Sequence, residues 1–137
     1  MGKSLWCKNR REIMTRLWEG KHAGSFIVSE ANSNSASSFG RSRETIAVQA
    51  SADAFEVGQV VTDTNGVWTI YADGDTPTGI IFDAVPVSTS IQAAVLIARD
   101  AEVNGAEIEW DAALTSAEIK TGVAELAKLG IIVREVV

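Results

Sequence analysis

The sequence predicts a small, predominantly β domain with one helix near its C-terminus that packs on the sheet. Short runs of β-branched and aromatic residues recur between turn-forming residues from Glu44 onward. An Asn-Gly pair at 65–66, the strongest local signal for a hairpin, stands between two such runs. Residues 91–137 then have the pattern of strand, turn, strand, helix, strand. The 137 residues are enough for one domain, and a hydrophobic fraction of 46% is ordinary for a globular protein.

A change in charge divides the chain near residue 43. Residues 1–43 contain eight Lys or Arg and three Asp or Glu, a net charge of +5, whereas residues 44–137 contain four and fifteen, a net charge of −11. We therefore predict a basic, flexible N-terminal arm over residues 1–43 and a β-rich domain over residues 44–137. Ser and Asn dominate residues 29–42, which have too little apolar surface to offset the entropy of ordering them.

Two apolar stretches interrupt the basic arm. Residues 13–18 have the spacing that permits a short amphipathic helix, and residues 26–28 are an apolar patch able to form a few strand hydrogen bonds. A patch of this kind next to a flexible segment indicates an arm that orders on a partner by adding a strand to a sheet edge. A disordered tail with incidental apolar residues is the alternative interpretation. Met14 is a candidate translation start, which would make residues 1–13 an extension.

The strands of the domain follow in chain order. Residues 45–48 form a short alternating strand, and residues 57–71 contain the two runs that flank the Asn-Gly pair. After a turn cluster at 73–77, residues 79–87 read as another strand, whose Pro86 marks an edge or an end. The run AAVLIA at 93–98 is apolar enough to be buried.

A second Asn-Gly pair, at 104–105, predicts a second hairpin, with Ala, Ile and Trp alternating over residues 106–110 on one face. In that register Glu102 would oppose Glu107, and like charges directly opposite each other destabilise a strand pair. Either the register differs or the acidic face meets a basic partner. The sequence leaves both interpretations open.

The predicted helix, at about 115–129, has both ends marked in the sequence. Thr115 and Glu118 have the spacing of a capping box, and Gly130 stands where a left-handed C-terminal cap is wanted. Residues 131–137 continue at once as a β-branched strand. One face carries an apolar stripe of Ile119, Val123, Leu126 and Ala127. A helix this short is marginal alone in water, so it must pack on a sheet.

The sequence offers little for catalysis, metal binding or a cofactor, and we predict none of these. His22 and Cys7 are the only soft metal ligands, too few for a structural zinc site, and both lie in the arm. Asp73 and Asp75 flank a glycine as in a calcium loop, but they lack the later glutamate of an EF-hand and read as a turn. No segment approaches a membrane span of about 20 apolar residues. The acidic domain would repel a nucleic acid, although the arm could touch one.

Six segments, in their order and spacing, carry a resemblance to a known family. They are EGKHAGSFIVSEAN, SRETIAV, FEVGQVV, TGIIFDAV, VLIARDAEVNGAEIEW and AELAKLGIIVRE, which together span about residues 19–135. This order resembles the head decoration proteins of tailed bacteriophages, the group that includes lambda head decoration protein D. The resemblance implies a small β-clip type fold and a structural role without catalysis.

The resemblance also implies partners and a location. A protein of this family would bind the major capsid protein on the outer surface of the expanded head as a homotrimer, after synthesis in the host cytoplasm, and stabilise the shell against DNA pressure. The residues we expect to contact the capsid are Trp18, Phe26, Ile27, Val28, Arg41 and Arg43. The predicted trimer contacts are Glu107, Glu109 and Trp110. The alternative functions are a small β-domain ligand-binding module and an accessory protein without a capsid role.

Overall fold

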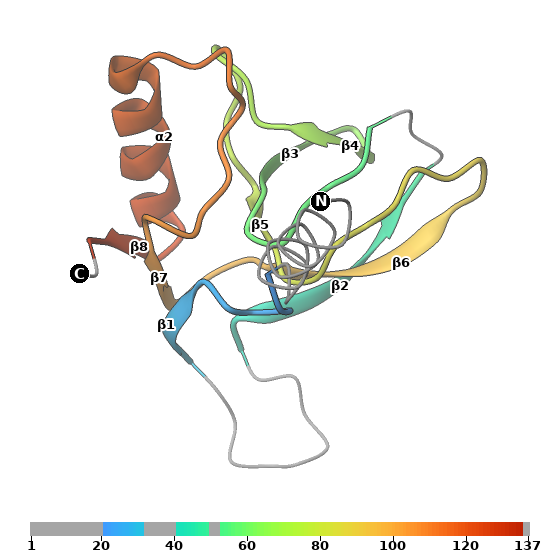
Figure 1. The fold of residues 1–137 in the computed structure, drawn as a ribbon, viewed down its shortest axis with the longest axis horizontal. Helices are drawn as coiled ribbons and strands as arrows, with labels where there is room; N and C mark the ends of the chain where they lie inside the picture. The colour runs from blue at the N-terminus through green and yellow to red at the C-terminus, as the bar shows by residue number, and fades with distance from the viewer. Residues whose placement is uncertain (1–20, 32–40, 50–52, 136–137) are drawn as a thin grey trace, which may run out of the picture.

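A computed structural model describes residues 21–31, 41–49 and 53–135. In these residues the chain forms two β-sheets and one helix (Figure 1). The elements are β1 (Ile27–Glu30), β2 (Arg43–Val48), β3 (Val60–Thr64), β4 (Val67–Ile70), β5 (Gly79–Ile81), β6 (Gln92–Ile97), β7 (Ala101–Asn104), α2 (Ser116–Lys128) and β8 (Ile131–Arg134). The predicted fold class, mainly β with one C-terminal helix, is confirmed.

The larger sheet has five strands in the order β2-β6-β5-β3-β4, all antiparallel. Its β3–β4 hairpin confirms the prediction made from the first Asn-Gly pair. Asn65 and Gly66 have φ angles of 53° and 87°, as a two-residue type I′ turn requires. The carboxylate of Asp63 accepts a hydrogen bond from the Gly66 N–H at 2.8 Å, which fixes the turn further.

The two ends of this five-stranded sheet approach each other. Gln49, directly after β2, is hydrogen-bonded to both backbone groups of Trp68 in β4. Its Nε2 donates to the Trp68 carbonyl at 3.4 Å, and its Oε1 accepts from the Trp68 N–H at 3.3 Å. The amide thus takes the place of a neighbouring strand at this point, and the sheet curls around its own apolar cluster. That cluster comprises Val48, Phe55, Val61, Trp68, Ile81, Val85, Ala94, Leu96 and Ala98.

The smaller sheet has three strands, with β7 in the middle. β1 pairs with β7 in antiparallel orientation and β8 pairs with it in parallel orientation. Because parallel strands need a crossover connection, the chain leaves β7, passes through α2 and returns as β8. A second apolar cluster lies between α2 and the two sheets. It comprises Phe26, Val57, Val60, Tyr71, Ile80, Ile97, Ala101, Val103, Ile108, Leu126 and Ile131.

The helix begins and ends where the sequence predicts. The Thr115 hydroxyl accepts a hydrogen bond from the Glu118 N–H at 3.3 Å, and Gly130 has a φ of 83° just beyond the last turn. Glu118 departs from a capping box, because its carboxylate accepts from the Thr115 hydroxyl at 3.0 Å. The apolar stripe of the helix differs from the predicted one at one position, because Ala127 is exposed and Gly122 is buried instead.

The second predicted hairpin, at residues 104–105, is wrong. β7 has no free edge for residues 106–110, because β1 and β8 already occupy both of its sides. The chain turns after Asn104 and runs to a different neighbour. There the Glu109 N–H donates to the Gly58 carbonyl at 2.9 Å, and the Glu109 carbonyl accepts from the Val60 N–H at 3.2 Å. Glu102 therefore does not oppose Glu107.

Candidate functional site

The residues predicted to contact a capsid do not form one surface. Trp18 lies outside the described residues. Phe26 is fully buried in the apolar cluster beneath α2, and Ile27 packs against the same cluster. The prediction that Phe26 is a surface anchor is therefore wrong, because the subunit's own core uses this side chain. Val28 points outward and is 47% exposed.

The predicted boundary between arm and domain also changes. Residues 21–31 are part of the folded domain, because β1 pairs with β7. The Asn104 N–H donates to the Phe26 carbonyl at 2.7 Å, and the Gly24 N–H donates to the Phe82 carbonyl at 2.8 Å. A charge count could not reveal this, since the pairing depends on contacts more than 70 residues apart. The rest of the predicted arm, residues 1–20 and 32–40, lies outside the described residues.

Arg43 belongs to a polar cluster that joins β1 to β2, which we call the Glu30–Arg43 cluster: Glu30, Ser42, Arg43 and Phe82. Arg43 forms an ion pair with Glu30, and its Nε lies 3.1 Å from Glu30 Oε2. The Ser42 hydroxyl donates to the same carboxylate at 2.6 Å, and the Arg43 guanidinium lies 4.2 Å from the centre of the Phe82 ring. The Glu30 side chain is only 8% exposed. Arg43 therefore contacts residues of its own subunit, and it is not a free cation available to the capsid.

The protonation of Glu30 reflects these contacts. Burial alone would raise the pKa of its carboxyl, but hydrogen bonds from Arg43 and Ser42, together with the Arg43 charge, lower it below the ordinary value of 4.5. The carboxylate is thus held in its charged form. The cluster is a desolvated ion pair whose two partners depend on each other.

Arg41 is the predicted cationic contact that remains at the surface. Its Nε lies 3.0 Å from Asp100 Oδ2, yet its side chain is 72% exposed. The neighbouring Arg99 pairs with Glu44 and donates to the Arg41 carbonyl at 2.7 Å, which fixes the backbone beneath it. Arg41 can therefore exchange its exposed partner for one on another protein at small cost.

The predicted trimer contacts are held by the subunit itself. Lys21 forms an ion pair with Glu109 and donates to the Glu107 carbonyl at 2.7 Å. Trp110 packs edge-on against Tyr71, with ring centres 6.0 Å apart, and its ring covers Gly122 of α2. All three predicted side chains are partly exposed, so their outer portions remain available.

Glu102 also meets a basic residue, and that residue comes from the same chain. It pairs with Arg134 on β8 at 2.6 Å and accepts from the Ser29 hydroxyl on β1 at 3.0 Å. Both hydrogen bonds lower the pKa of Glu102 below 4.5. The acidic face that the sequence left unexplained is thus neutralised in part across the three-stranded sheet.

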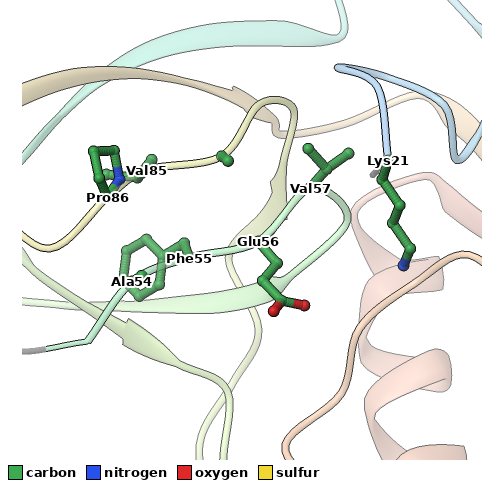
Figure 2. Close-up of a pocket in the computed structure, with 8 residues that line it drawn as sticks. Lys21, Ala54, Phe55, Glu56, Val57, Val85 and Pro86 are labelled. Atoms are coloured by element: carbon green, nitrogen blue, oxygen red, sulfur yellow. The ribbon is translucent and has the colours of Figure 1, made fainter. Parts of the chain in front are cut away.

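Other surface features were missed by sequence reasoning. Val87 and Ile91, in the loop between β5 and β6, are 58% and 73% exposed. A hollow of about 430 Å³ lies beside this loop, and we call it the Phe55 hollow. Figure 2 shows Phe55, Val85 and Pro86 on one side of it, with Val57 and Lys21 on the other. It is lined by Lys21, Ala54, Phe55, Glu56, Val57, Ala84, Val85 and Pro86. The sequence signal near it is Pro86, which we interpreted as the edge or the end of a strand and not as part of a hollow.

The described residues carry no group of three or more His, Cys, Asp or Glu that could hold a metal ion. No helix in this part of the chain is both long and apolar enough to cross a membrane. The surface instead offers an edge strand, exposed aliphatic side chains and a surface arginine. These features are typical of a small β domain that makes contacts with other proteins.

The comparison with protein families identifies the family to which this small β domain belongs. The family model for bacteriophage lambda head decoration protein D matches residues 17–131, which is most of the chain. The chain therefore belongs to the bacteriophage lambda head decoration protein D family, and the resemblance found in the sequence is confirmed. No curated protein and no solved structure matches it. The family is structural rather than enzymatic, and membership implies association with the phage capsid in the virion.

Proposed function

We propose that this protein binds the outer surface of the expanded phage head as a trimer and stabilises the shell against the pressure of the packaged DNA. The observation that carries the proposal is the family match over residues 17–131. A subunit that binds the assembled lattice, and not its dissociated parts, stabilises the lattice by mass action. Many copies of modest affinity reinforce one another where each spans neighbouring capsid subunits.

We propose that the capsid-binding surface comprises residues 1–20 together with Val28 and Arg41. Among the described residues, β1 pairs only with β7, so its other edge offers backbone groups to a further strand. Val28 on this strand is 47% exposed, and Arg41 is 72% exposed at its side chain. Phe26 and Arg43 support the surface indirectly, by holding β1 to the body.

We keep the loop that bears Glu107, Glu109 and Trp110 as the proposed contact between copies. Lys21, Tyr71 and Gly122 cover one side of these residues, and the outer side would face a neighbouring subunit. Replacing Glu107 by Lys should shift the sedimentation of the free or capsid-bound protein away from a trimer. Unchanged association would exclude this loop from the interface.

Co-sedimentation with expanded heads that lack the protein tests the capsid proposal. Three forms should be compared: the full chain, a chain that begins at Lys21, and Val28→Glu. We expect saturable binding by the full chain and weaker binding by the other two. A truncation at Glu44 would be a poor test, because it removes Phe26 and β1 from the fold.

Val67→Glu is the matched control. Val67 is 48% exposed and lies on β4, the edge strand of the other sheet, so the substitution has the same chemistry at the same exposure. It should bind heads as the unaltered chain does. No binding by the full chain would exclude the capsid role, and equal loss from both substitutions would exclude β1 as the specific contact.

A further inference from the structure

The Phe55 hollow has an apolar floor that the backbone holds firmly. Phe55 and Val85 exchange two backbone hydrogen bonds, of 2.9 and 2.8 Å, across the floor. Their side chains, together with that of Val57, belong to the two apolar clusters of the domain. A volume of about 430 Å³ is within the range of sites that hold a large side chain or a small ligand. An apolar recess of this size is a candidate binding site.

The position of Lys21 identifies which segment can reach this recess. Lys21 lines the hollow (Figure 2) and is the first described residue, so it is the residue through which residues 1–20 are joined to the domain. Three residues of extended chain span at most about 10 Å. Trp18, three residues before Lys21, is therefore within reach. Leu17 and Trp18 are the nearest large apolar side chains before the rim.

Charge favours the same segment. Residues 1–20 contain five Lys or Arg and two Asp or Glu, whereas residues 44–137 have a net charge of −11. Glu56 lies at the rim of the hollow and is exposed, and it forms no ion pair with another described residue. A basic segment that runs past the rim would bring opposite charge to this carboxylate.

We propose that Trp18 of the free subunit binds in the Phe55 hollow of its own chain. The large, flat ring would bury its apolar surface against the floor, while the basic residues before it lie near Glu56. If residues 1–20 also contact the capsid, as proposed above, this docking competes with capsid binding. The hollow then acts as an autoinhibitory site that the capsid must empty.

Fluorescence of the free protein tests the docking without any capsid. The spectrum of Trp18 is obtained by subtracting that of Trp18→Phe from that of the full chain. We expect blue-shifted emission and protection from acrylamide. Ala84→Leu narrows the hollow and should make the Trp18 signal severalfold more easily quenched. Ala84 is exposed, so the substitution leaves the core intact.

Ala113→Leu is the matched control, since Ala113 is exposed and lies away from the hollow. It should leave Trp18 protected. A freely quenched Trp18 in the unaltered chain would overturn the proposal, as would equal protection in Ala84→Leu with an unchanged thermal transition. Protection that increases with protein concentration would also overturn it, because Trp18 would then enter the hollow of a second copy.

A second measurement looks at the hollow itself. Trp18→Ala should leave it open and increase the binding of an apolar dye such as anilinonaphthalene sulfonate, and Ala84→Leu should cancel that increase. No increase would contradict the proposal. Both measurements can fail while head binding stands, so the two proposals are separable. If both hold, Ala84→Leu should bind heads more tightly than the unaltered chain, because the competing contact is weakened.

Discussion

Two contacts attach β1 and α2 to the rest of the domain, and they differ in kind. The Glu30–Arg43 cluster joins β1 to β2 through a desolvated ion pair. In the other contact, Gly122 of α2 packs against the rings of Trp110 and Tyr71, and we call this the Trp110 contact. The polar contact depends on the presence of both partners, whereas the apolar contact depends on their shape. The two should therefore respond differently to substitution, salt and pH.

The largest effect should come from removing one partner of the polar contact. Arg43→Met removes the cation that pairs with the desolvated Glu30 carboxylate, and we expect a loss of about 3 kcal/mol in the free energy of unfolding. Urea denaturation, analysed by its midpoint at unchanged slope, measures this loss. The double variant Glu30→Gln with Arg43→Met should recover part of it, because the neutral amide still accepts from Ser42. Equal losses in the single and double variants would show that the charge of Glu30 is not the cause of the loss.

The Trp110 contact should break by steric overlap. A Cβ atom at position 122 would lie 2.7 Å from Trp110 Cζ3 and 3.0 Å from Tyr71 Cε1. Overpacking typically costs about 1–3 kcal/mol, and replacing a helical glycine offsets about 1 kcal/mol of that. The difference is a loss of up to about 2 kcal/mol. Because the nearest contact is with the Trp110 ring, which also packs against Tyr71, we expect Gly122→Leu to fall in the upper half of that range in the same urea assay.

Ala124→Leu is the matched substitution on the exposed face of α2. It should change the free energy of unfolding by less than about 0.5 kcal/mol. If both leucines had the same small effect, the close approach of Trp110 to the helix would not contribute to stability.

A smaller effect should come from the start of α2. Thr115→Ala removes the hydroxyl that accepts from the Glu118 N–H, and the loss of such a cap costs about 1 kcal/mol. Ser116→Ala, one residue further along, should have almost no effect by thermal denaturation. Comparing Thr115→Ala with Ser116→Ala measures the contribution of the N-terminal cap alone, independently of how the helix packs on Trp110. Equal effects would show that the cap contributes nothing at this site.

The sequence was most informative where structure is local. The Asn65-Gly66 turn, the Thr115 cap and the Gly130 C-terminal cap each depend on residues within a few positions of one another, and all three were predicted correctly. Gly122 was missed, because a glycine within a helix pattern shows no partner. Its burial depends on Trp110 and Tyr71, which come from two other segments of the chain.

The errors share a long-range cause. The second Asn-Gly pair does form a turn, but whether a hairpin follows depends on which strands already occupy β7. In the same way, residues 21–31 look like part of a basic arm until their pairing with β7 is known. The candidate capsid site was predicted only in part. Val28 and Arg41 are exposed and Phe26 is buried, and the sequence could not distinguish them because the exposure of a side chain depends on the whole fold.

The smallest expected effect is on the pH dependence of the free energy of unfolding, which should differ between the Glu30–Arg43 cluster and the Trp110 contact. Because the folded-state pKa of Glu30 is lowered, its contribution to stability is complete above its unfolded pKa, near 4.5, and is lost as the pH falls through the lower folded value. Glu102 behaves in the same sense, so the difference between the unaltered chain and Glu30→Gln isolates Glu30. That difference, measured by urea denaturation, should shrink below pH 4.5.

Gly122→Leu should show no such convergence with the unaltered chain in acid, because the Trp110 contact contains no carboxylate. Its only titrating ring is Tyr71, whose pKa is raised above 10.0 by burial and by the nearby carboxylates, chiefly that of Asp73. The stability that this phenol contributes is present below pH 10 and is lost as the pH rises through the higher folded value. Convergence of Gly122→Leu with the unaltered chain below pH 4.5 would mean that the two contacts are coupled through the core and do not act separately.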